Sequence, residues 1–259
     1  MLSGGIFLEV VLNGFSAYLR ANPLVITLTT TLPRATMQVV FFTLLGSVTL
    51  QSADSEYSFV GSVAIAILLS TVIQISDVPA DEKWQGTFYR LRTSAVSPVA
   101  LIYLRAIPYV VEGLFVGCIS WVVAGAVTGN AELIPKLLPL FPILLLVSIT
   151  SGLAGLALAS PVLGKRADVV VSNGAVYLII VAGGLIVPNT DLPMLSVIGK
   201  VLPATNGLQA ARGILAGEPG WSGSLWLELI VGLGWGLVGA ALYWNQVRKA
   251  HKNGTDDFA

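Results

Sequence analysis

Six long apolar runs constrain the fold of this chain more than any other feature of its sequence. They fall at about 24–49, 59–76, 99–127, 137–160, 172–188 and 223–245 of the 259 residues. Each is near the roughly 20 apolar residues that a helix needs to cross a bilayer. Only 11% of the residues are charged, against roughly 25% in a soluble domain. The sequence therefore predicts an all-α integral membrane protein, with six transmembrane helices in a single domain over residues 1–259.

The segment before the first run, residues 6–20, has the pattern of an amphipathic helix. Glu9, Asn13, Ser16 and Arg20 recur on one helical face, and mostly apolar side chains fill the rest. We expect a helix that lies in the membrane interface rather than one that crosses the membrane. A buried or frayed N-terminal helix is the alternative.

Residues 189–221, before the last run, contain two apolar stretches that are too short to cross a membrane. These stretches are 194–202 and 207–215, and prolines such as Pro193 and Pro203 interrupt the segment repeatedly. A plain extracellular loop has no need of such apolar stretches. We therefore predict two short re-entrant helices on the outer side, whose irregular backbone is covered by protein, with the plain loop as the alternative.

Lysine and arginine are distributed unequally between the two sides of the predicted spans. One side carries ten of them and the other three, and cytoplasmic segments carry the excess of positive charge. The sequence therefore predicts that both termini, including the tail 246–259, face the cytosol, which an even number of crossings satisfies. The ten are Arg20, Lys83, Arg90, Arg92, Arg105, Lys165, Arg166, Arg248, Lys249 and Lys252, and the three are Lys136, Lys200 and Arg212.

A charged loop, residues 77–98, separates the second and third runs. Its residues 81–98 read DEKWQGTFYRLRTSAVSP. Trp84, Phe88 and Leu91 fall at i, i+4 and i+7, the spacing of one helical face, and the charged residues lie largely off that stripe. This pattern predicts a short amphipathic helix that docks a partner or lies among the lipid headgroups. A solvated loop is the alternative.

Three charged residues lie in or near the predicted spans: Arg34, Arg105 and Glu112. Glu112 follows Arg105 by two helical turns, so both share a face of the third span. An ionisable group within a membrane is a functional candidate by default. The sequence leaves open whether Arg34 and Glu112 line a pathway or only pair within the bundle. For Arg105 it favours a side chain that reaches the cytosolic headgroups.

Motifs for catalysis and cofactor binding are missing from the sequence. The stretch nearest to a P-loop, Gly164-Lys165-Arg166, lacks the following Ser or Thr and the first glycine. A single cysteine and a single histidine exclude the usual zinc and iron–sulfur sites. A net charge of zero predicts no nucleic-acid partner. We therefore expect no enzyme activity and no catalytic, cofactor-binding or metal-binding residue on this chain.

Together with the predicted topology, three stretches resemble permease subunits of the type-2 ABC exporter superfamily, the group of antibiotic-resistance, daunorubicin-type and polysaccharide exporters. Similar to that family are the acidic–basic start at 81–83 with Gly86-Thr87 and Ser97-Pro98, the stretch LPATNGLQAARGIL at 202–215, and Ala21-Asn22-Pro23 with Pro33. The chain departs from many members after Gly-Thr, where they carry an acidic residue and this sequence has Phe88, Tyr89 and Arg90.

The resemblance implies a mechanism in which two permease chains, identical or different, form the pathway. A separate pair of ATPase subunits would hold ATP and Mg beneath them, in the bacterial cytoplasmic membrane. The 81–98 helix would carry the movement of the ATPases into the spans. The residues implied for this coupling are Glu82, Trp84, Gly86, Phe88 and Arg90.

The expected cargo is a small amphiphilic compound, such as an antibiotic, drug, peptide or lipid-like molecule, of the kind that multidrug-resistance exporters move. A polysaccharide or glycolipid exporter of the same superfamily is the alternative, but the tryptophans lie mostly near predicted interfaces, where Trp is common anyway. An ion-coupled secondary transporter would instead use Arg34, Arg105 and Glu112 as a relay and need no ATPase. An intramembrane enzyme acting on lipid is disfavoured, since paired catalytic groups are missing.

Overall fold

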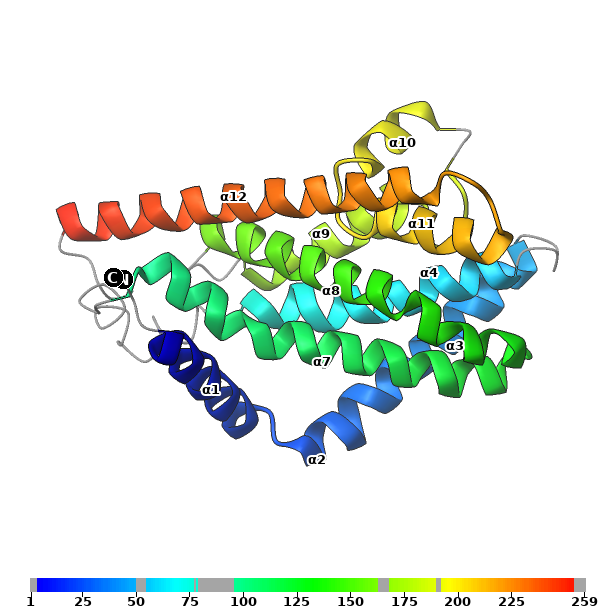
Figure 1. Cartoon of the computed structure of the whole chain (residues 1–259), viewed down its shortest axis with the longest axis horizontal. Helices are drawn as coiled ribbons and strands as arrows, with labels where there is room; N and C mark the ends of the chain where they lie inside the picture. The colour runs from blue at the N-terminus through cyan, green and yellow to red at the C-terminus, as the bar shows by residue number, and fades with distance from the viewer. Residues whose placement is uncertain are drawn as a thin grey trace.

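Figure 1 shows the computed structural model, a bundle of helices. The structure describes residues 4–49, 55–76, 78, 96–162, 168–189 and 192–253. In chain order its helices are α1 (Gly4–Ala21), α2 (Leu24–Ile26), η1 (Thr27–Thr31), α3 (Leu32–Thr49), α4 (Ser55–Leu68), η2 (Leu69–Ile73), η3 (Gln74–Ser76), α7 (Pro98–Val127), η4 (Ala131–Lys136), α8 (Leu137–Ala159), η5 (Ser160–Val162), α9 (Asp168–Ala182), α10 (Pro193–Gly199), α11 (Thr205–Ala216) and α12 (Trp221–Asn253).

Five helical stretches of the described chain are long and apolar enough to cross a membrane. They are Leu24–Thr49, Ser55–Ser76, Pro98–Val127, Ala131–Ala159 and Trp221–Lys249, and they coincide with five of the six predicted runs. For the residues that the structure describes, the predicted all-helical fold is therefore confirmed, with five helices suited to a membrane by length and composition.

The sixth predicted run corresponds to α9, which is apolar but shorter, with its apolar part at Val170–Ala182. The helix ends where Gly183 and Gly184 follow, and Gly184 takes a left-handed φ of 60°. Glycine adopts this conformation without steric cost and commonly ends a helix. A sixth crossing at 172–188 stays a prediction.

Helix α4 forms the centre of the bundle, since residues 58–68 are all buried. Helices α3, α7 and α8 pack around it. The ring of Phe59 meets that of Trp121 on α7 edge to face, with 5.0 Å between centroids. Trp121 in turn donates through Nε1 to the carbonyl oxygen of Leu133, at 2.9 Å. A helix that is apolar all round is expected to lie in such a central position.

The first and last spans, by contrast, keep one side uncovered. Large apolar side chains along both are exposed, although each helix packs on the bundle through its other side. In a spanning helix such a face meets lipid tails or another subunit. Examples are Met37, Phe41 and Val48 on α3, and Trp226, Ile230 and Leu237 on α12.

Two π turns, η1 and η2, widen the first and second spans. Pro33 follows η1, and a proline inside a helix removes one backbone donor and clashes with the carbonyl four residues back. In η2 the hydroxyl of Thr71 donates to the carbonyl of Ile67, so a side chain competes with the backbone for that acceptor. Such turns are frequent at functional sites, and these two flank the polar cluster described below.

Two groups of elements mark the opposite ends of the bundle. Figure 1 shows the start of α1, the start of α7 and the end of α12 at one end, with α10 and α11 toward the other. α1 lies obliquely against α7, where Tyr18 and Tyr109 stack edge to face at 4.9 Å. The helix predicted at 6–20 is confirmed as a helix, and its place in the membrane interface stays a prediction.

The two short helices predicted before the last span are present as α10 and α11. Their bounds, Pro193–Gly199 and Thr205–Ala216, lie close to the predicted stretches. Proline begins α10, and Ala204, with a left-handed φ of 70°, precedes α11. Their depth in the membrane, and hence their re-entrant character, stays a prediction.

Candidate functional site

The buried carboxyl group of Glu112 gathers polar side chains from three other parts of the chain. Glu112 lies on α7 and is 6% exposed. Tyr18 from α1, Thr27 from the first π turn and Gln74 from the end of the second span lie close enough to interact with it. Arg34 of α3 adds an electrostatic attraction. Arg34 and Glu112 therefore interact within a cluster that joins α1 to three spans, and a role of either residue in lining a pathway stays a prediction.

We call Glu112, Tyr18, Thr27, Gln74 and Arg34 the Glu112 cluster. Two of its polar atoms have no hydrogen-bond partner among the described residues. Within the described residues, Tyr18 Oη and Glu112 Oε2 are both buried and neither completes a hydrogen bond. Burial, and next the neighbouring Glu112, raise the pKa of the Tyr18 phenol well above its ordinary value, so the phenol stays a neutral donor. A buried polar group without a partner is costly and calls for a functional or structural explanation.

The other residues predicted for the site do not join this cluster. Arg105 is partly buried on α7 and lies beneath α1, where a Cβ at Gly14 would come within 3.3 Å of the Arg105 Cα. It shares the predicted helical face with Glu112 but is not among the groups that act on that carboxyl. The residues predicted for coupling lie outside the described part of the chain: Glu82, Trp84, Gly86, Phe88 and Arg90.

We expect Glu112→Gln to impair transport while the protein still folds and inserts. The amide fills the same space but removes the charge that Arg34 attracts. Arg105→Lys serves as the matched control, since it keeps a positive charge at a position outside the cluster, and it will be much milder. The measurement is transport of substrate across the membrane of cells that express equal amounts of each variant. Loss of the folded protein in Glu112→Gln would show that the group is structural.

A second buried carboxylate, Glu228 on α12, holds the start of α11. It is fully buried and accepts hydrogen bonds from the backbone N–H groups of Ala204, at 2.8 Å, and Gly207, at 3.0 Å. The hydroxyl of Thr150 on α8 donates to the same carboxylate. A negative charge is favourable at the positive end of a helix, so Glu228 ties α8, α11 and α12 together.

Arg212 on α11 makes a comparable clamp toward α4. Its guanidinium carbon lies 3.3 Å from the centroid of the Tyr57 ring. Its Nη2 donates to the backbone oxygens of Tyr57, at 3.0 Å, and Leu185, at 2.7 Å. Burial lowers the pKa of Arg212 to about 10, so it stays positively charged at neutral pH. α11 is thus held from both sides by charged residues.

Neither Glu228 nor Arg212 was predicted from the sequence as a site residue. Glu228 lies within the apolar run at 223–245 and meets the criterion by which Glu112 was selected, an acidic residue in a predicted span. Arg212 was counted only as one of the three positive residues on the predicted outer side. The partners of both are mainly backbone groups, which no side-chain pattern reveals.

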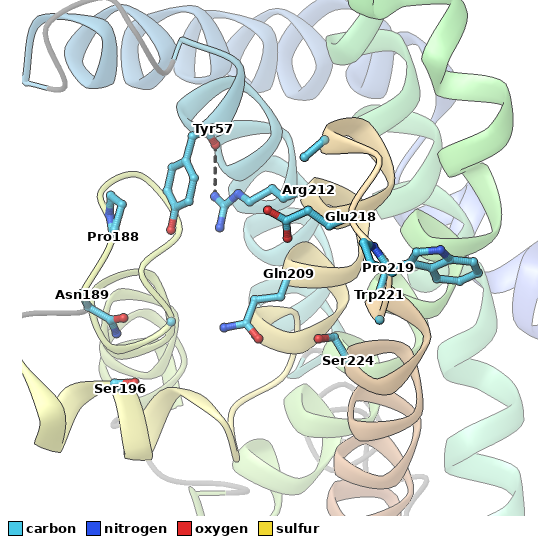
Figure 2. A pocket seen from close by; sticks show the side chains of 14 residues that line it. Tyr57, Pro188, Asn189, Ser196, Gln209, Arg212, Glu218, Pro219, Trp221 and Ser224 are labelled. Carbon is cyan, nitrogen blue, oxygen red and sulfur yellow. Dashed lines mark hydrogen bonds between the residues drawn. The ribbon is translucent and has the colours of Figure 1, made fainter.

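A cavity of about 540 Å³ opens beside Arg212, at the end of the bundle where α10 and α11 lie. Figure 2 shows Tyr57, Pro188 and Asn189 on one side of it and Trp221 and Ser224 on the other, with Arg212 and Gln209 between them. We call it the outer cavity. Among the described residues, no group of His, Cys, Asp and Glu is arranged to hold a metal ion.

One comparison with known proteins gives a match. The family model of the ABC-2 type transporter matches residues 10–216, which is most of the chain and includes α11 and four of the five candidate spans. No curated protein and no solved structure matches this chain.

Proposed function

The chain belongs to the ABC-2 type transporter family and is a permease component of such a transporter, and we propose that it exports a small amphiphilic compound across the bacterial cytoplasmic membrane. The match over residues 10–216 carries this proposal, together with the five apolar spans. A family permease associates with an ABC ATPase subunit, which supplies the hydrolysis. We infer that the cargo is an antibiotic, drug, peptide or lipid-like molecule rather than a polysaccharide.

We propose that two permease chains assemble around the pathway, with their termini in the cytosol. The exposed apolar faces of α3 and α12 leave room for a second chain as well as for lipid. The excess of lysine and arginine at one end supports the orientation. The start of α1 and the end of α12 lie at one end of the bundle (Figure 1), as this orientation requires.

The coupling to the ATPase is proposed to lie in residues 81–98. This segment joins the second span to α7, and α7 begins at the same end of the bundle as α1 (Figure 1). Its aromatic side chains, Trp84 and Phe88, are one helical turn apart in the predicted amphipathic helix. Aromatic anchors that fill a partner groove typically contribute about 2 kcal/mol or more each, so they are the side chains on which docking would depend.

We therefore expect Trp84→Ala combined with Phe88→Ala to uncouple the transporter without unfolding it. ATPase subunit that co-purifies with the tagged permease will fall sharply, and cargo will no longer stimulate ATP hydrolysis. Leu138→Ala with Met194→Ala is a suitable control, because these side chains are 82% and 79% exposed and lie on α8 and α10. Normal ATPase association and export in the Trp84 and Phe88 double variant would contradict the proposed coupling.

A further inference from the structure

We propose that the outer cavity binds an amphiphilic oxyanion, a carboxylate or phosphate carried on an apolar body, and that Arg212 recognises its negative group. The proposal rests on the proposed function, because it assigns to an exporter a site for the charged part of a ligand. The ligand could be the exported compound or a membrane lipid, and both would present the same chemistry to the cavity.

Arg212 has donors that its contacts within the protein do not use. A guanidinium group carries five N–H donors in a planar fork, and only Nη2 bonds to the carbonyls of Tyr57 and Leu185. Nε is buried without a hydrogen-bond partner in the described part of the chain. Arg212 lines the outer cavity, so its donors beyond these two bonds can serve a ligand there.

The positive charge of Arg212 is also uncompensated by any acid that the structure describes. Glu218 lines the same cavity, but it is exposed and does not contribute to the electrostatics of Arg212. The Tyr57 ring offers its negative face to the guanidinium, which leaves the full unit of positive charge in place. A partly buried cation without a paired anion is unfavourable, so a bound oxyanion would stabilise this arrangement.

The cavity suits the rest of such a ligand in size and in lining. Its volume, about 540 Å³, lies within the roughly 300–1,000 Å³ typical of small-molecule sites. Asn189, Ser196 and Gln209 add neutral polar groups, and Pro188 and Pro219 add apolar surface. The ligand can therefore place its oxyanion against Arg212 and its apolar part against the prolines.

The test measures binding of simple amphiphiles to the full chain, purified in a neutral detergent. Dodecyl phosphate and dodecanoate should bind by isothermal titration, and dodecyltrimethylammonium, with the same tail and the opposite charge, should not. Arg212→Gln should weaken dodecyl phosphate binding at least ten-fold.

Gln209 provides a pair of variants that do not depend on the Arg212 clamp. It is exposed on α11 and lines the cavity. Gln209→Glu places a negative charge in the cavity wall and should weaken binding several-fold, whereas Gln209→Lys should strengthen it. Glu132→Lys shifts the net charge by two positive units, more than Gln209→Lys does, at an exposed position that does not line the cavity and should change nothing. Equal affinities in both Gln209 variants and in Arg212→Gln, or equal binding of the cationic amphiphile, would overturn the proposal.

Competition distinguishes the two sources of the ligand. If phosphatidylglycerol in nanodiscs displaces dodecyl phosphate from the wild-type chain, a lipid headgroup occupies the cavity. If it does not displace dodecyl phosphate while the Gln209 variants still act in opposite directions, a free amphiphile occupies it. These measurements need no ATPase, so their failure would leave the proposed export function standing, and failure of the coupling test would leave the oxyanion site standing.

Discussion

Glu228→Ala will strongly destabilise the protein, because it removes the acceptor on which the start of α11 depends. The backbone N–H groups of Ala204 and Gly207 and the hydroxyl of Thr150 all donate to this carboxylate. The Thr150 hydroxyl can still donate to the Val147 carbonyl oxygen, at 3.2 Å, but the two backbone N–H groups lose their acceptor. Each buried donor left without a partner costs roughly 1–3 kcal/mol, so the two together cost about 2 kcal/mol or more. The positive end of the α11 dipole also loses its counter charge. The measurement is thermal unfolding of the purified protein in detergent.

Graded variants separate the hydrogen bonds of Glu228 from its charge. In Glu228→Gln the side-chain oxygen still accepts a hydrogen bond, but the new NH2 group faces groups that also donate. The melting temperature of this variant will therefore lie between those of the wild type and Glu228→Ala. Glu56→Gln is the control for the loss of a carboxylate. Glu56 lies 4.0 Å from Lys136 in an exposed ion pair, and such pairs contribute about 0–1 kcal/mol. Equal stability of Glu228→Ala and Glu56→Gln would show that Glu228 does not hold α11.

The spans could be predicted from the sequence because their signal is local. About 20 consecutive apolar residues are needed wherever a helix crosses a membrane, and five of the predicted runs are helices of that kind. α9 is the instructive case. Its run extends to residue 188 on hydropathy alone, yet the helix ends at Ala182 because two consecutive glycines follow. Hydropathy measures the affinity of a segment for lipid, whereas glycine decides where the backbone turns.

The candidate site, too, could be predicted only in part from local sequence signals. Glu112 was predicted because a single acidic residue in an apolar helix is itself a signal. The participation of Tyr18 and Gln74 was not predicted, since it depends on how α1 and the end of the second span lie against α7. The function of Glu228 depends on the backbone of residues 204–207, which reaches the carboxylate only through the packing of α11 on α12. Contacts to a remote backbone leave no pattern in side-chain spacing.

Close packing of α4 against the turn after α9 is the second feature whose loss will have a large effect. Gly61 faces this turn, and a Cβ at this position would overlap the carbonyl oxygen of Leu185. It would also lie 2.6 Å from the Leu185 carbonyl carbon and 2.9 Å from Arg212 Nη2. These are backbone atoms and a clamped guanidinium, which cannot move aside as a flexible side chain can. The absence of a side chain at Gly61 is therefore what lets the turn reach α4.

Gly61→Ala will therefore displace the Leu185 carbonyl and weaken the Arg212 clamp at the same time. Forcing extra volume into a packed interior typically costs about 1–3 kcal/mol, and overlap with backbone places this variant at or above the upper end. Gly234→Ala on α12 is the matched control, because no atom lies within 4 Å of the added Cβ. Its stability will be unchanged or higher, as alanine favours a helix over glycine by about 1 kcal/mol. The two variants are compared by thermal unfolding in detergent, and a Gly61→Ala protein as stable as Gly234→Ala would mean that the turn does not pack on α4 as described.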